Sequence, residues 1–282
     1  MINGNLLRGQ TPVIGIVGGT GPEATINLQL ELFNAMRSFL EPVKDQDYYP
    51  VYIDNDPTIP DRSQAIISQE QEILTTYVKR IQRLERLGAN VVILACNTAH
   101  AFMSHIQEKV NVLLINMVKM SIEYFVRTYP TVKKVGLLAT LGTMRSKIFH
   151  EELLKYNVFV EEVDEEAQIK IHQAIYGIKA GFKYDSDLKH APQRLYGVYK
   201  LFGEISEKDD LKSPFRLLQE VLEKMSSINL SHIILGCTEL PLILKQPILQ
   251  NQVLYNPLPA IARKTLQYCN QLGNHSFYKE AI

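Results

Sequence analysis

Two cysteines far apart in the chain stand in nearly the same local sequence, and a positioned thiol can accept or donate a proton. The first lies in Val91-Val92-Ile93-Leu94-Ala95-Cys96-Asn97-Thr98, and the second lies in Ile233-Ile234-Leu235-Gly236-Cys237-Thr238. Each apolar run has the length and the β-branched content of a buried parallel strand. The thiols are therefore expected at equivalent strand ends, which suggests two proton-handling groups that face one substrate.

The residues after each cysteine predict how the thiols are held. Thr98 and Thr238 suit the N-cap of a helix, so each strand is expected to turn into a helix at its cysteine. Backbone N–H groups and the positive end of a helix dipole favour a thiolate at such a turn. Because the usual pKa of a thiol is about 8.5, only a modest lowering is needed for proton transfer near neutral pH.

Other roles for the cysteines fit the pattern less well. A single buried cysteine is usually a small apolar core residue, but two in matching contexts argue against coincidence. His100 stands four residues after Cys96, a spacing seen among metal ligands, yet nothing near Cys237 completes a set. We interpret His100 as a helix residue near the site. Cys269, in a helical pattern near the C-terminus, is interpreted as a packing or surface residue.

Composition argues against several classes of function. Lys+Arg and Asp+Glu each total 30 in 282 residues, so the formal charge is zero and no surface for nucleic acid or an anionic membrane is indicated. Residues 1–10 contain no apolar signal segment, and no run approaches the about 18 apolar residues of a membrane span. Three cysteines without disulfide spacing fit a reducing compartment. We expect a cytoplasmic protein that binds a small molecule and has no nucleic-acid or membrane partner.

The order of the predicted elements is that of an α/β fold. Apolar runs alternate with amphipathic segments, which predicts parallel sheets with helices on both faces. The expected strands are 13–17, 51–54, 91–95, 112–115, 135–139, 158–162 and 233–236. The expected helices are 22–40, 63–87, 118–129, one from about 143, 165–180 and one from about 259.

The pattern restarts in mid-chain, which indicates a diverged internal repeat. From Gly15 to Cys96 is 81 residues and from Gly136 to Cys237 is 101, and an insertion at 182–211 is expected to hold the excess. We predict two similar doubly wound parallel-sheet domains related by a pseudo-two-fold. The active site is expected in the cleft between them, at the carboxyl ends of the strands. The predicted N-terminal domain is 1–116 with 256–282, and the predicted C-terminal domain is 117–255.

The glycine-rich turn after the first strand has two interpretations. Gly19, Gly21 and Ala24 match the dinucleotide fingerprint G-x-G-x-x-G/A between a strand and a helix. The acidic residue that should follow about 20 positions on is Asp54 at best, 33 residues after Gly21. Pro22 also removes an N–H donor that a phosphate could use. We favour a tight turn that presents backbone N–H groups to a carboxylate.

A second polar loop, Asp54 to Ser63, follows the next strand and is expected to end at Ser63 as a helix N-cap. Arg62 in this loop could form a bidentate pair with a substrate carboxylate. Lys179 stands near the end of a predicted helix, where a single lysine is often only solvated.

Five motifs together resemble the aspartate/glutamate racemase superfamily, and most closely its aspartate racemase branch. They are Gly18-Gly19-Thr20-Gly21-Pro22, the loop from Asn55 to Arg62, Cys96-Asn97-Thr98-Ala99-His100, Ala139-Thr140-Leu141-Gly142-Thr143 and Gly236-Cys237-Thr238-Glu239-Leu240. They stand in the family's order and span about Val13 to Leu258. The resemblance implies a racemase with two α/β domains and no cofactor or metal.

The resemblance also implies a role for each site residue. Cys96 and Cys237 would be the acid/base pair. The residues that would hold the α-carboxylate and amino group are Asn55, Asn97, Thr98, Thr143 and Thr238, and those that match the positions for the side-chain carboxylate are Arg62 and Lys179. The chain departs from the family pattern at Thr20, where an apolar residue is expected, at Asn256, where Asp is expected, and in the insertion at 182–211, a candidate lid or oligomer contact.

We therefore predict a two-base racemase that interconverts L- and D-aspartate. Inversion of an α-carbon needs a base on one face and an acid on the other. Glutamate or a broader range of amino acids is the alternative within the superfamily, and a nucleotide-binding oxidoreductase is the alternative of another class. Both cysteines are present, which argues against the decarboxylases of this superfamily, since these keep one. A homodimer is expected.

Overall fold

A computed structural model of the chain describes residues 11–68, 72–203 and 211–273. It divides into two compact units. Unit 1 contains the described residues up to Ser121 and from Leu258 onward, and unit 2 is Ile122–Pro257. The sequence had predicted domain boundaries after residues 116 and 255.

Unit 1 contains a parallel four-stranded sheet with the order β2-β1-β3-β4. The strands are β1 (Ile14–Val17), β2 (Val51–Asp54), β3 (Val91–Leu94) and β4 (Leu113–Ile115), close to the predicted runs. Every residue of β1 and β3 is buried, because helices cover both faces of the sheet.

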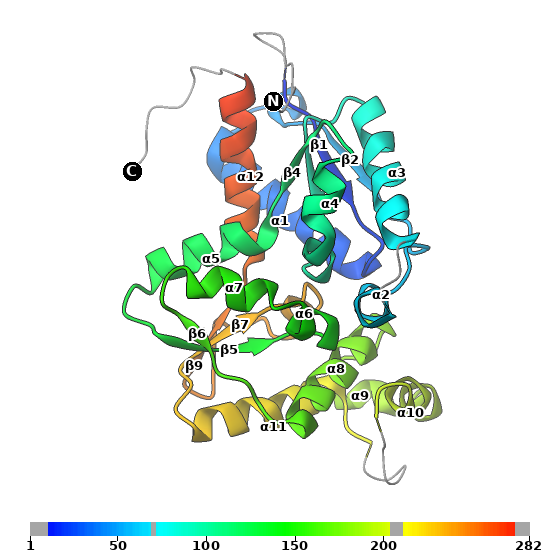
Figure 1. The fold of residues 1–282 in the computed structure, drawn as a ribbon, viewed down its shortest axis with the longest axis vertical. Coiled ribbons are helices and arrows are strands. Elements are labelled where there is room, and N and C mark those ends of the chain that lie inside the picture. The colour runs from blue at the N-terminus through cyan, green and yellow to red at the C-terminus, as the bar shows by residue number, and fades with distance from the viewer. Residues whose placement is uncertain (1–10, 69–71, 204–210, 274–282) are drawn as a thin grey trace. The chain divides into compact units, whose positions relative to one another are not determined.

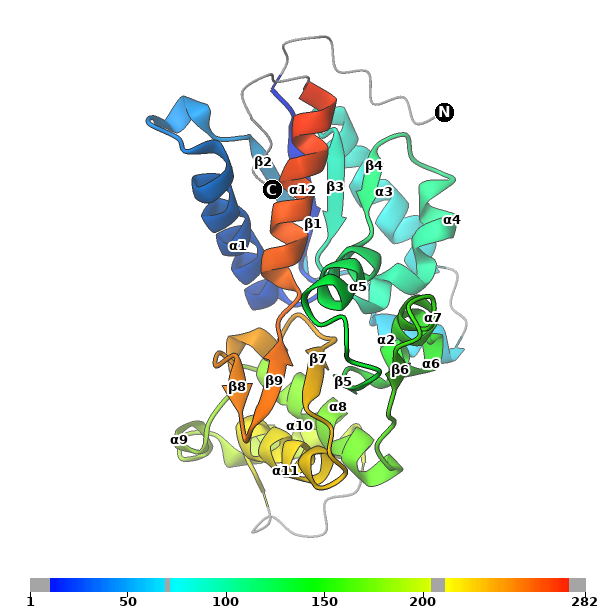
Figure 2. The ribbon, with the colours of Figure 1, turned by 90° about the vertical axis from the view of Figure 1, so that its left-hand side faces the viewer.

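Two groups of helices cover the two faces of the unit 1 sheet, as Figure 2 shows. On one face, α1 (Pro22–Leu40) and α12 (Leu258–Gly273) pack on Ile14, Ile16 and Ile93. On the other, α3 (Glu72–Arg86) and α4 (Met103–Gln107) pack on Val17, Val92 and Leu94. The single helix predicted for 63–87 is found as α2 (Arg62–Ser68) and α3, and residues 69–71 lie outside the described chain.

Unit 2 contains a five-stranded sheet with the order β6-β5-β7-β9-β8. The strands are β5 (Lys134–Leu138), β6 (Phe159–Val160), β7 (His232–Leu235), β8 (Ile248–Leu249) and β9 (Gln252–Tyr255). All neighbours are parallel except β8 and β9, which are antiparallel. The order β6-β5-β7-β9 repeats the order β2-β1-β3-β4 of unit 1, so the two units share one doubly wound topology.

Helices of unit 2 include some close to the predicted 118–129, 165–180 and the one from about 143, and others that the sequence did not predict. One face of the sheet packs on α8 (Glu165–Lys179), α10 (Pro192–Lys200) and α11 (Pro214–Ser227), which lie together in Figure 1. Phe125 of α5 (Met117–Thr128) makes edge-to-face contacts with the rings of His232 and Tyr255 of the strands. Two further helices follow β5, namely α6 (Leu141–Ser146) and α7 (Ile148–Leu154).

The insertion at 182–211 is partly helical, whereas the sequence predicts no helix there. It contains α9 (Asp185–Leu188) and α10, and its residues 204–210 lie outside the described chain. Helix α11 was also missed. Among the described helices, none combines the length and the apolar character that a bilayer crossing requires.

Candidate active site

Cys96 and Cys237 occupy equivalent positions in the two units. In unit 1, Leu94 of β3 pairs with Val17 of β1, and Cys96 follows two residues later. In unit 2, Leu235 of β7 pairs with Leu138 of β5, and Cys237 follows two residues later. The exposed fractions of the two residues are 7% and 8%. Each thiol therefore lies just beyond the carboxyl end of the strand that pairs with the first strand of its unit.

The turn after each cysteine is a short 3-10 helix, which corrects the predicted N-caps. Thr98 is the first residue of one such helix (Thr98–Phe102), whose cap is Asn97 without a side-chain capping bond. Thr238 precedes the other (Leu240–Leu242), whose cap is Glu239, also without such a bond. Helices this short provide little dipole, so the helix-terminus argument for a thiolate is weak at both sites.

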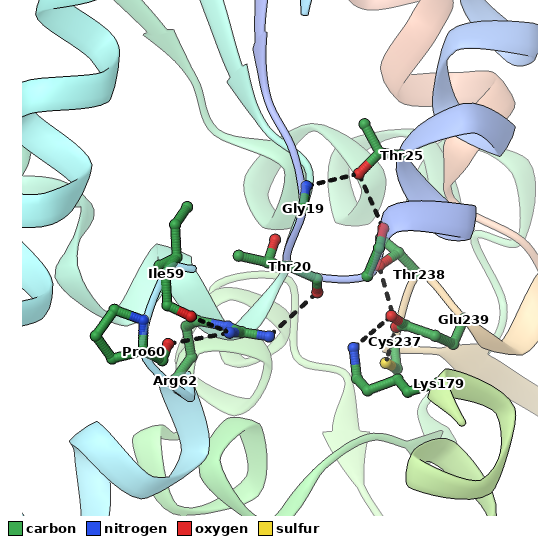
Figure 3. A network of polar contacts seen from close by, with 11 residues as sticks. Gly19, Thr20, Thr25, Ile59, Pro60, Arg62, Lys179, Cys237, Thr238 and Glu239 are labelled. Carbon is green, nitrogen blue, oxygen red and sulfur yellow. Dashed lines mark hydrogen bonds and ion pairs between the residues drawn. The ribbon is translucent and has the colours of Figure 1, made fainter. Parts of the chain in front are cut away.

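Two N–H groups of the glycine-rich turn of unit 1 are bonded within the protein and are not available to the carboxylate that the sequence predicts there. Gly18 N donates to Asp54 O at 2.9 Å, and Gly19 N donates to the Thr25 hydroxyl at 3.2 Å. That hydroxyl donates in turn to Gly21 O at 2.9 Å, an arrangement drawn in Figure 3. The N–H groups of Gly18 and Gly19 are thus occupied, for a phosphate as well as for a carboxylate. The turn gives the nucleotide-binding alternative no support.

Gly19 also marks a close approach of two main-chain segments. Its φ is +79°, and a Cβ atom there would lie 2.1 Å from the carbonyl oxygen of Asp56. Only glycine fits, because no L side chain can occupy that space. The turn is therefore packed directly on the loop that follows β2.

A buried arginine holds that loop. Arg80 of α3 contacts Asp54 Oδ1 at 2.9 Å, Asp56 Oδ2 at 2.6 Å and Thr58 Oγ1 at 2.8 Å. Asp56 Oδ1 also accepts a hydrogen bond from Thr58 N at 2.9 Å. These contacts fix the segment between β2 and α2, where Asn55 is exposed with its Nδ2 atom 3.5 Å from Pro22 O.

The helix after this loop begins at a different cap from the predicted one. Asp61 Oδ1 accepts a hydrogen bond from Gln64 N at 2.8 Å, which is the geometry of an N-cap. Ser63 is buried inside the helix. The prediction of Ser63 as the cap is therefore wrong by two residues.

The guanidinium of Arg62 faces main-chain carbonyl groups of the protein, as Figure 3 shows. Nη1 lies 3.4 Å from Ile59 O and 3.0 Å from Pro60 O, and Nη2 lies 3.2 Å from Thr20 O. Burial lowers the pKa of Arg62, but the Cys96, Tyr77 and Asp61 side chains outweigh burial and raise that pKa overall. Arg62 thus places a cation beside Cys96, a role that the sequence did not suggest.

Two further side chains of unit 1 lie around Cys96. Tyr77 of α3 is fully buried in the same apolar cluster, and burial raises the pKa of its phenol, so it stays neutral. The His100 ring contacts Cys96 O through Nδ1 at 2.9 Å and accepts from Met117 N through Nε2 at 3.1 Å. This pair of bonds assigns the proton of the neutral ring to Nδ1, and burial lowers the pKa of His100. His100 therefore supports the main chain at Cys96.

One face of α8 holds the site loops of unit 2. Gln168 Nε2 donates to Ala139 O at 3.0 Å, and His172 Nδ1 accepts from Leu141 N at 3.1 Å. Lys179, two turns further along the helix, forms an ion pair with Glu239. The spacing of 168, 172 and 179 places these side chains on one side of the helix.

The loop between β5 and α6 contains two threonines that bond to each other. Thr140 is the N-cap of α6 and its Oγ1 accepts from Thr143 N at 3.4 Å. The two hydroxyl oxygens are 3.1 Å apart, and Thr143 is buried. The predicted substrate residue Thr143 thus lies in the first turn of α6, two residues after its start at Leu141.

Glu239 joins Lys179 to Cys237. Its Oε1 pairs with Lys179 Nζ, and its Oε2 accepts from Cys237 Sγ at 2.9 Å and from Thr238 Oγ1 at 3.4 Å. Burial raises the pKa of the Cys237 thiol, and the charge of Glu239 raises that pKa further, against the opposing effect of Lys179. The environment of Cys237 therefore favours the thiol, contrary to the thiolate-favouring environment that the sequence predicts there.

The structure brings the predicted residues together in two groups, one in each unit. Arg62 lies with Cys96, beside Thr20, which has an exposed fraction of only 2%. Lys179 and Thr238 lie with Cys237. The side chains of Asn97 and Thr98 are buried next to Cys96 in the chain, whereas Asn256 follows β9 and is half-buried. Within the described part of the chain, no group of three or more His, Cys, Asp or Glu side chains could hold a metal ion.

The sequence profile of the Asp/Glu/hydantoin racemase family matches residues 17–265, and the chain belongs to this family. The chain is therefore placed among the racemases, a class of isomerases. The match includes both cysteine motifs and the glycine-rich turn.

Individual relatives agree with this family. The broad specificity amino-acid racemase RacX of Bacillus subtilis is 28% identical over 201 residues, which are 71% of this chain and 82% of RacX. A glutamate racemase of Aliarcobacter butzleri is 24% identical over 245 residues, 85% of this chain and 80% of the relative. An uncharacterized protein of Pectobacterium carotovorum is 33% identical over 115 residues, so the match spans 58% of its length.

The fold is that of a solved racemase. The Picrophilus torridus aspartate racemase superimposes with a TM-score of 0.67 at 24% identity, covering 93% of this chain and 99% of that structure.

Proposed function

We propose that the chain is an amino-acid racemase that interconverts L- and D-aspartate without a cofactor, with Cys96 and Cys237 as its two bases. The observation that carries this proposal is the equivalence of the two thiols. Cys96 lies two residues beyond the end of β3, and Cys237 lies two residues beyond the end of β7. These two strands occupy the same place in the strand order of their sheets. A single buried thiol has many explanations, whereas two in matching positions suit a reaction that treats two faces of one carbon alike.

The chemistry uses one thiolate and one thiol in each direction. The thiolate takes the α-proton, the electron pair of the Cα–H bond stays on the substrate, and the thiol delivers its proton to the opposite face. In the reverse direction the two sulfurs exchange roles. Asn55, Asn97, Thr98, Thr143 and Thr238 are proposed to bind the α-carboxylate and the amino group.

Aspartate is the proposed substrate because the motifs resemble those of the aspartate racemase branch. Arg62 and Lys179 also match the positions that this branch uses for the side-chain carboxylate. The alternative is glutamate or a broader range of amino acids, and it is favoured by the relatives, which include RacX and a glutamate racemase. The contacts of Arg62 and Lys179 with backbone carbonyls and with Glu239 keep this alternative open.

A chiral assay of the purified protein against the common amino acids tests the proposal. Cys96→Ala and Cys237→Ala should each abolish racemisation of aspartate, because inversion needs an acid and a base on opposite faces. Cys269→Ala is the matched control, since Cys269 is also buried but belongs to α12 and to neither motif. The control should retain activity. More than a small residual activity in either of the first two variants contradicts the two-base assignment.

Each single-cysteine variant should still remove the α-proton from one enantiomer, because one base remains. With a substrate that carries a leaving group on its β-carbon, elimination needs only one base, so each variant should still act on one enantiomer. Racemisation by the wild type should survive EDTA and hydroxylamine, and iodoacetamide should abolish it unless an acidic substrate is present. Loss of activity to EDTA alone would mean that a metal takes part. The cytoplasmic location and the homodimer stay predictions.

A further inference from the structure

Glu239 is the one carboxylate of the described residues that bonds directly to a cysteine sulfur. It is 2% exposed, and its two oxygens have different partners. One pairs with Lys179, while the other accepts the S–H of Cys237 at 2.9 Å. In Figure 3, Lys179 and Cys237 both point toward this carboxylate.

A carboxylate in this position acts on the charge of the sulfur. It accepts a hydrogen bond from the thiol, which stabilises the S–H form, and it repels a thiolate. Cys96 has the opposite neighbour, since the Arg62 guanidinium interacts with its side chain. The two thiols are thus equivalent in their place in the fold but opposite in their nearest charge.

This difference matters because a two-base cycle begins with one sulfur ionised and the other protonated. We propose that Glu239 is a positioning residue that holds Cys237 as a thiol, so that in the free protein Cys237 is the acid and Cys96 is the base. The inference rests on the proposed racemase function. In the first direction the proton of Cα–H passes to the Cys96 sulfur, and the proton of Cys237 passes to the carbon. Cys237 is then left as a thiolate beside Glu239, its less stable form, and must regain a proton before the next identical cycle.

Alkylation of the folded, full-length protein tests this without any substrate. Iodoacetamide reacts with thiolates, so peptide mapping at a series of pH values gives an ionisation midpoint for each cysteine. In the wild type, the ionisation midpoint of Cys237 should lie at a higher pH than that of Cys96. Their similar burial makes the comparison fair, and Cys269, with a pKa that burial raises to about 12, is the internal control for a thiol without a charged neighbour.

Glu239→Gln keeps the size of the side chain and removes its charge. The Cys237 midpoint should fall by roughly one unit, so that Cys237 reacts about ten-fold faster below the midpoint. The midpoint of Cys96 should not move. Glu239→Asp keeps the charge and should leave Cys237 closer to the wild type than Glu239→Gln does. A Cys237 midpoint that stays or rises in Glu239→Gln overturns the inference, as does a wild type in which Cys237 reacts at lower pH than Cys96.

The racemase reaction gives a second readout. Ionisation of the Cys237 thiol removes the proton donor and ends activity at high pH. The decline of kcat/KM on the alkaline side of its pH profile, the alkaline limb, should therefore move to lower pH in Glu239→Gln. The ratio of kcat/KM for the two enantiomers is uninformative, because the equilibrium constant of a racemisation is one. If the wild type racemises no amino acid, the proposed function fails while the alkylation order still decides the effect of Glu239. If it racemises aspartate and neither midpoint nor limb moves, only the inference about Glu239 fails.

Discussion

Arg62 donates a hydrogen bond through Nη2 to the carbonyl oxygen of Thr20, 3.2 Å away. Its other terminal nitrogen contacts Ile59 O and Pro60 O, and the guanidinium interacts with the Cys96 side chain. One side chain thus links the glycine-rich turn, the start of α2 and the first thiol. A lysine could not serve all these partners, because it lacks the planar fork of donors.

The first prediction separates this role from substrate binding. If Arg62 acts on Cys96 and on the two loops, Arg62→Ala should lower kcat/KM by the same factor for aspartate and for a neutral amino acid. A hydrogen bond from a charged group contributes about 1.5–3 kcal/mol, so the expected loss is roughly 10- to 150-fold. A loss confined to acidic substrates would instead assign Arg62 to the substrate's side-chain carboxylate. Alkylation of Cys96 provides a substrate-free measurement and should slow in Arg62→Ala.

A second prediction compares two arginines that share one carboxylate. Arg80 contacts Asp54 at 2.9 Å with both side chains about nine-tenths buried, whereas Arg83 contacts Asp54 at 3.4 Å and its side chain is 60% exposed. Arg80→Met leaves the buried Asp54 carboxylate with only the exposed Arg83 as its ion-pair partner and should reduce the free energy of unfolding by about 3–5 kcal/mol. Arg83→Met is the control and should cost less than about 1 kcal/mol. Urea unfolding of both variants checks this, and equal losses would contradict it.

The third prediction concerns the stability of the protein at acidic pH. The backbone N–H of Thr58 and its hydroxyl, together with Arg80, lower the pKa of Asp56 to about 2. Because the unfolded value is about 3.9, this stabilisation is complete above that pH and is lost as the pH falls through about 2. Asp56→Asn removes the titration, so its stability should change less between about pH 4 and pH 2 than that of the wild type. Circular dichroism across this range measures the difference, and identical slopes would rule the linkage out.

A fourth prediction compares two glycines with positive φ. Gly88 has a φ of +96°, and apart from Gly88 itself and its two chain neighbours, no described residue has an atom within 4 Å of the position that a Cβ would take there. Gly88→Ala therefore adds only backbone strain, about 1–3 kcal/mol. Gly19→Ala adds similar strain and also a contact of 2.1 Å with Asp56 O. The loop after β2 must then move, and Gly19→Ala should lose both stability and activity. Gly88→Ala should keep kcat/KM, and equal activity of the two variants would show that the close approach is unimportant.

The sequence predicted the strands of unit 1 and the cysteine positions well, because both depend on local composition, but β8 and β9 of unit 2 are not among the expected strands. Strands such as β1 and β3 are continuous apolar runs, and α1 begins at Pro22 as expected. Helix α11 was missed although Ser213 and Pro214 form a readable start, with Ser213 Oγ accepting from Arg216 N at 3.4 Å.

The chemistry around each thiol could not be predicted from the same patterns. Arg62 lies 34 residues before Cys96 and Lys179 lies 60 before Glu239 in the chain, so their contacts depend on tertiary packing. Glu239 stood within a motif, but its spacing of two residues from Cys237 did not show which way either side chain points. The predicted caps at Thr98 and Thr238 failed because both turns are 3-10 helices whose N-caps are the neighbouring residues Asn97 and Glu239 and make no side-chain capping bond.

Gly177 lies on α8 between His172 and Lys179, and a Cβ atom there would be 3.2 Å or less from Leu195, Tyr199 and Pro214. Leu195 and Tyr199 belong to α10 in the insertion, so α10 packs close to the main chain of α8. Helix α8 in turn supports both site loops of unit 2. Substitutions in the insertion can displace α8, and with it the loops at Leu141 and Glu239, while every loop residue stays unchanged. Substrate preference thus has a route to evolve through a segment outside the site loops.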